Sequence, residues 1–316
     1  MVTALIAALV SSQGSEADLG RVFKAGDHQE YSVASTLVVE ERSRGLQTWL
    51  PESLKLAYNF TIDVKALKAD GIAELRYQRP TMTETRGETA DSPPVTKVEK
   101  ANFDLQLDVS PMNEILSVKD LAKKDDKKKT GGGRWVNSAG GREAVLQDLG
   151  AYVGEIYRLS LFAGSFDSAL DFSPKLPFEK VAPGATWKKT VGYSPQKLGG
   201  KGKSAVQRLD YTFTYAGMVT VGAKKYQRVT ANLDLKTDLA AFLHESTGLT
   251  PDQTGLKEWP LTLQATIDFD LDPVTRNTVK AVARSEGGFK VITADFPDSP
   301  AQEQKLHGET ILKRVK

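Results

Sequence analysis

Alternation of apolar and polar residues, with a period of two, runs through most of this chain. The alternating segments are rich in aromatic and β-branched residues and lie at 31–41, 56–67, 72–79, 101–109, 208–221, 226–239 and 261–272. Because successive side chains of a strand point to opposite faces of a sheet, this period indicates half-buried antiparallel strands. Turn residues such as Ala69-Asp70-Gly71 separate the strands. We therefore predict a mainly β (α+β) protein.

A single long segment has a helical period instead. In residues 142–159, apolar side chains such as Leu149, Val153 and Ile156 recur at steps of three and four residues. This pattern predicts one long amphipathic helix in the middle of the chain. A second, short helix is expected to begin at Asp238, whose carboxylate can cap the first amide groups of "LAAFLHES".

The segments on either side of the long helix resemble each other. "YNFT" at 58–61 returns as "YTFT" at 211–214, "YQR" at 77–79 returns unchanged at 226–228, and "FDLQLDVSP" is similar to "IDFDLDP". These anchors follow one order and predict a duplicated β unit, with chance matching as the alternative. Each half is expected to be an antiparallel meander, and the two halves to form curved sheets or half-barrels with the helix between them.

The predicted organisation of the chain has four parts. They are a signal peptide and frayed start at 1–19, a first β half at 20–141, a central helix at 142–164 and a second β half at 165–316. The stretches at 80–100, 120–141 and 195–204, which are rich in proline, glycine and charge, are expected to be loops.

The N-terminus, "MVTALIAALVSSQGSEA", has an apolar run from Val2 to Val10 followed by small polar residues. This order predicts a signal peptide and export to the bacterial periplasm or the outside, although a buried N-terminal segment would have the same composition. No later window approaches the roughly 20 apolar residues that span a bilayer. We therefore expect no integral membrane span after the signal is removed.

The charge balance and the absence of cysteine restrict the classes of partner and of chemistry that the chain can have. The 42 basic and 40 acidic side chains nearly cancel, so the chain as a whole lacks the positive field that attracts nucleic acid, and no nucleic-acid partner is expected. The absence of cysteine excludes disulfides, thiolate metal sites and cysteine nucleophiles.

The stretch "KKDDKKKTGGGRW", 123–135, looks most like a functional motif. It is not a Walker A loop, because its lysine and threonine precede the glycines. Lys129-Thr130-Gly131 matches the KTG element of penicillin-binding folds, but the only Ser-x-x-Lys lies downstream, at 194–197. We predict a solvated loop. The alternative is a weak cationic docking patch formed by Lys127, Lys128 and Lys129.

Neither histidines nor carboxylates form a convincing catalytic motif. The histidines are far apart and in no metal-ligand spacing: His28, His244 and His307. Asp268, Asp270 and Asp272 in "DFDLD" are expected on one face of a strand, opposite Phe269 and Leu271. Such a row can bind Ca²⁺ or act as an acid/base pair, or it can simply be the wet face of a sheet. We predict no catalytic residue, cofactor or metal, and whether this row binds a metal stays open.

The stretch "LPFEKVAPGATW", 176–187, followed by long alternating strands and a "DLDP" turn, resembles uncharacterised exported bacterial β-sheet proteins of the domain-of-unknown-function type. Those proteins are distantly similar to lipoprotein-carrier half-barrels, in which a curved antiparallel sheet closed by a helix holds an acyl chain. The resemblance implies binding and brings no catalytic residues with it.

These observations favour an exported, non-enzymatic binding protein whose curved sheet and helix hold an apolar or lipid-like ligand. The alternatives are an envelope structural or protein-interaction module without a small ligand, whose partner is another envelope protein, and an aspartate-based hydrolase. The candidate ligand or docking surface comprises Tyr152, Ile156, Tyr211, Phe213, Tyr215, Lys127, Lys128 and Lys129.

Overall fold

The computed structural model describes residues 15–87, 93–100, 103–121, 153–154, 156–157, 159–161, 173–193, 207–247 and 249–316. Its elements are β1 (His28–Ser43), β2 (Leu50–Leu67), the 3-10 turn η1 (Ala69–Gly71), β3 (Ala73–Arg79), β4 (Met82–Gly87), β5 (Val95–Glu99), β6 (Phe103–Val109), β7 (Ile115–Asp120), β8 (Thr186–Tyr193), β9 (Gln207–Val221), β10 (Lys224–Asp238), α2 (Leu239–Thr247), α3 (Pro251–Thr254), β11 (Leu256–Glu258), β12 (Pro260–Leu271), β13 (Thr278–Thr293) and β14 (Gln302–Arg314). Every alternating segment of the sequence is a strand, which confirms the mainly β prediction.

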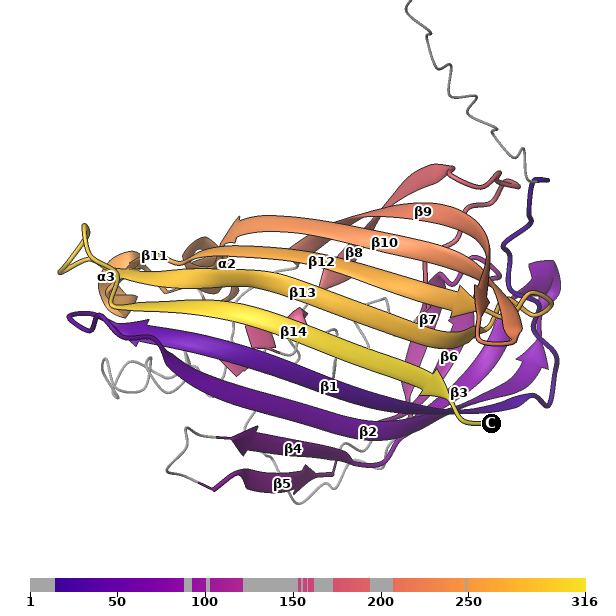
Figure 1. Ribbon diagram of the computed structural model, residues 1–316, viewed down its shortest axis with the longest axis horizontal. Helices are drawn as coiled ribbons and strands as arrows, with labels where there is room; N and C mark the ends of the chain where they lie inside the picture. The colour runs from indigo at the N-terminus through magenta and orange to yellow at the C-terminus, as the bar shows by residue number, and fades with distance from the viewer. Residues whose placement is uncertain are drawn as a thin grey trace, which may run out of the picture.

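The strands form one curved antiparallel sheet (Figure 1). In the described residues it has 14 strands, with the order β7-β6-β3-β2-β1-β14-β13-β12-β10-β9-β8; β4 pairs with β2 and β5, and β11 pairs with β13. The first strand and the last strand are neighbours, in a register that runs from Tyr31 opposite Arg314 to Ser43 opposite Gln302. The two predicted halves therefore contribute to a single sheet. Their origin by duplication stays a prediction.

Alternation gives the sheet two unlike faces. On β12, Leu261 and Leu263 are buried, whereas Thr262 and Gln264 are exposed. We call the face with the buried side chains the inner face, and the other the outer face. Aromatic rings pack across strands on the inner face, as where Tyr31 of β1 stacks on Phe60 of β2 at 4.8 Å between ring centroids. Burial of this face supplies the hydrophobic core.

Six residues of the predicted central helix are helical, and the end of this stretch contacts the inner face, whereas the long amphipathic helix itself stays a prediction. Residues 153–154, 156–157 and 159–160 are helical, and the rest of 142–159 lies outside the described residues. Ser285 Oγ donates a hydrogen bond to the carbonyl oxygen of Ser160 (2.6 Å), and Thr310 Oγ1 donates to that of Leu161 (2.7 Å). The last carbonyls of a helix have no partner within the helix. Hydroxyls of β13 and β14 provide those partners here.

The second helix is confirmed and one predicted loop is wrong. α2 begins after Asp238, whose Oδ1 accepts hydrogen bonds from the backbone amides of Ala240 (3.0 Å) and Trp259 (2.8 Å). The predicted loop at 80–100 contains β4 and β5, which pair as an antiparallel hairpin. β5 is mostly exposed and β4 is mostly half-buried, so neither strand has the alternation of buried apolar residues that would have indicated it in the sequence. The predicted loops at 120–141 and 195–204 lie almost entirely outside the described residues.

The N-terminal segment from Ala17 packs against the body of the protein. Residues 1–14 of the chain, which include most of the predicted signal peptide, lie outside the described residues. Ala17 forms a β-bridge with Val181, and Leu19 is fully buried, although both were expected in a frayed start. Within the described part of the chain, every helix is too short or too polar to cross a lipid bilayer.

Candidate functional site

The described residues of the predicted ligand surface lie in the core. Ile156, Tyr211, Phe213 and Tyr215 are all buried, and Phe213 stacks on Trp187 with 5.7 Å between ring centroids. Tyr152 and the lysines Lys127, Lys128 and Lys129 lie outside the described residues. Since a ligand could reach the four buried side chains only by displacing core contacts, their role in binding stays a prediction.

Asp268 and Asp270 of β12, and Asp272 directly after it, make hydrogen bonds and an ion pair within the fold. Asp268 and Asp270 lie on the outer face as expected: Asp268 accepts a hydrogen bond from Thr230 Oγ1 (2.7 Å), and Asp270 pairs with Arg228 (2.7 Å). Asp272 begins the next turn, where it accepts from backbone amides including that of Thr275 at 2.7 Å. Burial opposes ionisation of Asp272, but these hydrogen bonds outweigh it and lower its pKa. Among the described residues, no group of three or more ligating side chains is placed to hold a metal ion.

His28 and His244 have different surroundings, which shift their pKa values in opposite directions. His28 Nδ1 lies 2.6 Å from Asp63 Oδ1, and its Nε2 lies 3.0 Å from Glu30 Oε1. Hydrogen bonds to Asp63 and then to Glu30 raise the pKa of His28, whereas burial lowers the pKa of His244. We expect His28 to lose its proton at the higher pH in a titration followed by NMR.

The raised pKa of His28 also sets the sign of its contribution to stability. The stabilisation is fully present below the pKa of an unfolded histidine and is lost as the pH rises through the folded value. The difference in urea midpoint between the wild type and His28→Gln should therefore disappear at alkaline pH, and His307→Gln is the control. Titration of His28 at a lower pH than His244 would contradict the assignment.

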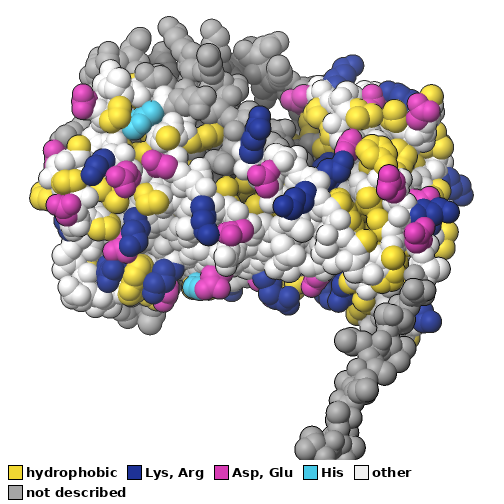
Figure 2. Space-filling model, turned by 90° about the horizontal axis from the view of Figure 1, so that it is seen from above, with side chains coloured by type: hydrophobic (Ala, Val, Ile, Leu, Met, Phe, Trp, Pro, Cys, Tyr) yellow, Lys and Arg dark blue, Asp and Glu magenta, His cyan; other side chains and the backbone are white. Residues whose placement is uncertain are grey.

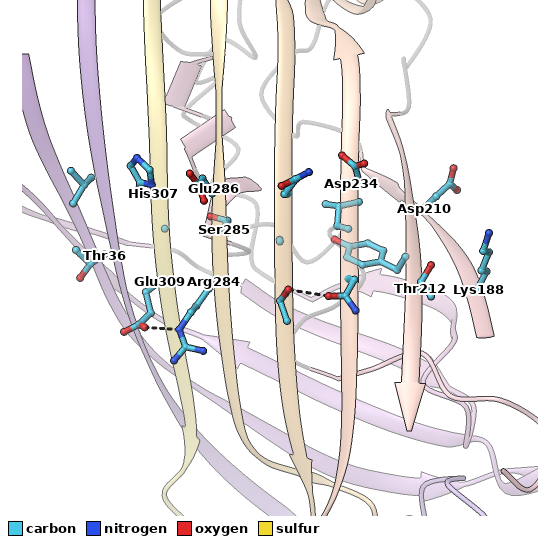
Figure 3. A pocket seen from close by; sticks show the side chains of 18 residues that line it. Thr36, Lys188, Asp210, Thr212, Asp234, Arg284, Ser285, Glu286, His307 and Glu309 are labelled. Carbon is cyan, nitrogen blue, oxygen red and sulfur yellow. Dashed lines mark hydrogen bonds and ion pairs between the residues drawn. The ribbon is translucent and has the colours of Figure 1, made fainter. Parts of the chain in front are cut away.

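A broad polar groove crosses the outer face (Figure 3). It encloses about 1120 Å³ and crosses β1, β14, β13, β12, β10, β9 and β8. Strand register aligns one row of its side chains across the sheet: Thr36, Glu309, Arg284, Thr266, Asn232, Thr212 and Lys188. Of the four described residues of the predicted ligand surface, Tyr211 alone borders this outer groove.

The outer groove is a weak candidate for a ligand site. Its exposed side chains already pair with one another, as Arg284 does with Glu309 (3.3 Å) and Thr266 with Asn232 (2.9 Å). Seen from above, the molecule as a whole also carries side chains of both charges interspersed over its surface (Figure 2). A ligand that used these polar side chains would have to break the contacts that they make with one another, which offsets part of its own binding energy.

A smaller pocket lies at one end of the inner face. It encloses about 470 Å³ between the helical residues around Tyr157 and the ends of β1, β2, β4, β11, β13 and β14. We call it the end pocket. Its polar wall carries Glu41, Glu52, Arg86, Tyr157 and Gln304, and its apolar wall carries Val153, Leu256, Trp259 and Val291. The lining also includes Thr254, Thr293 and Gln302, so polar and apolar side chains are combined in one cavity.

The polar wall is organised by a hydrogen-bonded chain. Tyr157 Oη donates to Gln304 Oε1 (2.7 Å), and Gln304 Nε2 donates to Glu41 Oε2 (3.0 Å). Glu41 and Gln304 face each other in the register of β1 and β14. Burial raises the pKa of Tyr157, and the negative charges of Glu52 and Glu41 add to that rise, so the phenol stays protonated and donates.

The apolar wall is centred on Trp259. This side chain is 1% exposed and meets Phe289 edge-on at 5.6 Å between ring centroids. Asp238 binds the backbone amide of Trp259 while capping α2, which fixes the segment that enters β12. Leu256 of β11 and Val291 of β13 complete the wall. The wall is therefore held by packing on one side and by a helix cap on the other.

Sequence reasoning missed the end pocket. Its residues come from strands at both ends of the chain and from the central helix, and each is ordinary in its own segment. Glu41 and Glu52 look like solvated strand-end charges, and Gln304 lies in a strand that the alternation did not single out. Only the pairing of β1 with β14 brings them together.

No protein-family model matches the chain, and no curated protein matches it. Among solved structures, DynF from the dynemicin biosynthesis pathway of Micromonospora chersina is 6% identical, with 97% of this chain and 89% of that chain covered and a TM-score of 0.24. OmpF of Salmonella typhi in complex with daunomycin is 9% identical over 91% of this chain and 98% of that chain, with a TM-score of 0.20. A DUF1329 family protein from Desulfovibrio piger is 8% identical over 91% of this chain and 86% of that chain, with a TM-score of 0.14. These TM-scores are too low to carry an argument about function.

Proposed function

We propose that this chain is a non-enzymatic binding protein that holds an apolar or lipid-like ligand in the end pocket. The observation that carries the proposal is the combination of apolar and polar side chains in the lining of a cavity of about 470 Å³. Sites for small molecules usually enclose about 300–1,000 Å³ and combine apolar walls with a few oriented polar groups. The end pocket has this size and this composition.

The proposal includes export, because an apolar run from Val2 to Val10 precedes small polar residues at the N-terminus. It also assigns no catalytic role to the aspartates of β12. Asp268 and Asp270 are engaged by Thr230 and Arg228, and these contacts account for their presence on the outer face. Binding explains the arrangement of the end pocket without requiring chemistry.

The test is thermal unfolding of the protein with long-chain alcohols, fatty acids, alkylamines and lysophospholipids below their micelle concentrations. A ligand at about 100 times its dissociation constant should stabilise the folded state by about 2.7 kcal/mol and raise Tm. Val291→Trp should abolish the rise in Tm, because the indole would occupy the end pocket next to its apolar wall.

Val38→Trp is the matched control. Val38 is 39% exposed and borders the outer groove, so the same substitution there fills the other concavity and should leave the ligand-dependent rise in Tm intact. The proposal fails if no compound raises Tm of the wild type. It also fails if Val38→Trp removes the effect while Val291→Trp keeps it, since the ligand would then occupy the outer groove.

A further inference from the structure

We propose that the end pocket selects an amphiphile with a primary ammonium head, which binds Glu41, and an alkyl tail, which lies against the half-buried Val291. This inference rests on the proposed function and specifies its ligand class. It depends on three features of the described residues: the fixed orientation of one amide, the neutralisation of one guanidinium, and the place of Val291 on β13, two strands away from Glu41 on β1.

The orientation of Gln304 determines what Glu41 offers to the pocket. An ionised carboxylate only accepts hydrogen bonds, so the side-chain amide of Gln304 must present Nε2 to Glu41 and Oε1 to Tyr157. Glu41 Oε2 receives that one hydrogen bond at 3.0 Å, and the described part of the chain provides no hydrogen-bond partner for its Oε1. A carboxylate has about four acceptor positions. The polar wall therefore has accepting capacity that a donor on the ligand can use.

The cation of the polar wall is already paired. Arg86 Nε donates to Glu84 Oε1 at 2.8 Å, and the side chain of Glu84 is only 13% exposed. Glu52 lies close enough to influence the charge of Arg86 as well. An anionic head would thus compete with Glu84 for Arg86 and meet the negative charges of Glu41 and Glu52. A cationic head meets attraction from the same groups.

The apolar wall gives the ligand a direction. Glu41 and Gln304 lie on β1 and β14, whereas Val291 and Leu256 lie on β13 and β11, further along the sheet. A head bound at Glu41 consequently leaves its tail pointing across β14 toward Val291 on β13. A ligand with no polar end would leave the acceptors of Glu41 without a donor, which is costly in a partly dry site.

The experiment compares an alkylammonium, an alcohol and a carboxylate of the same chain length by calorimetry, with each compound below its micelle concentration. A charge-assisted hydrogen bond should make the ammonium bind about tenfold more tightly than the alcohol, with the carboxylate weakest. Glu41→Gln should weaken ammonium binding about tenfold and leave the alcohol unchanged. Glu40→Gln is the control, because Glu40 precedes Glu41 on β1 and pairs with Lys305 on the outer face.

Arg86→Gln provides a variant that does not touch Glu41. Removing this cation should tighten ammonium binding severalfold, because the polar wall becomes more negative. If none of the three compounds binds, the proposed function itself fails. If all three bind equally, or if Arg86→Gln abolishes carboxylate binding while Glu41→Gln changes nothing, the pocket binds amphiphiles but the assignment of a cationic head is wrong.

Discussion

Gly287→Ala and Gly288→Ala are each expected to lower the free energy of unfolding by about 3 kcal/mol, the upper range for overpacking. A Cβ atom at Gly287 would lie 2.2 Å from the carbonyl oxygen of Thr262, and one at Gly288 would lie 2.3 Å from that of Gln304. Both obstacles are backbone atoms, on β12 and β14 respectively. Neither can move aside without disturbing the hydrogen-bonded ladders on the two sides of β13.

Urea unfolding of the two variants measures this effect. Gly154→Ala is the control, because Gly154 is helical and a Cβ atom there would meet nothing within 4 Å. That variant should be unchanged or more stable by up to about 1 kcal/mol. Midpoints for Gly287→Ala and Gly288→Ala equal to that of the wild type would show that the strands do not approach as closely as described.

Arg21→Ala is expected to cost about 3 kcal/mol, because it leaves buried acceptors without donors. Arg21 is only 7% exposed. Its guanidinium donates to Asn277 Oδ1 at 3.0 and 2.8 Å and to Asn113 Oδ1 at 3.0 Å. Burial lowers the pKa of Arg21 to about 10, so the group is still charged at neutral pH.

Two further variants separate the causes of that loss. Arg21→Met keeps most of the buried volume and removes the donors, so a loss nearly as large as in Arg21→Ala would assign the effect to the hydrogen bonds. Val22→Ala is the control, since Val22 is 54% exposed and its replacement should change stability by less than about 0.5 kcal/mol. Wild-type stability of Arg21→Met in urea would mean that the buried donors contribute nothing.

The strands that alternation predicts are those with one buried apolar face. The segment 261–272 is almost the whole of β12, and 56–67 lies within β2. The pattern was readable because the inner face buries a large side chain at every second position. The same reasoning located the cap at Asp238, whose carboxylate does bind the amide of Ala240.

β13 and β14 were not predicted from the sequence, because their inner positions do not carry a large apolar residue at every second place. β14 carries Gly308 and Thr310 at inner positions, where a large side chain would be expected, because the helix end at Ser160 and Leu161 occupies that space. β13 is interrupted by Gly287, whose missing side chain makes room for the backbone of β12. In both strands, a neighbour that is remote in sequence determines the residue type.

The end pocket could not be predicted from local sequence patterns, because its residues are brought together by strands that are remote in sequence. Binding was expected on the apolar inner face around Tyr211 and Phe213, where periodicity concentrates aromatic residues, but that region is filled by core packing. The end pocket depends on charged residues near strand ends, such as Glu41, that meet only through pairing across the whole chain. Periodicity identifies packed faces, whereas a cavity is a place where packing is incomplete.

The pairing of β1 with β14 has a consequence for biosynthesis. Tyr31 is made long before its partner Arg314, so a nascent chain holds β1 with one unpaired edge until β14 has been synthesised. Contacts between residues so remote in sequence form slowly, because a long loop must close first. A ribosome-bound chain that stops before β14 should therefore expose a strand edge prone to aggregation, and holdase chaperones would be expected to bind it until β14 is released.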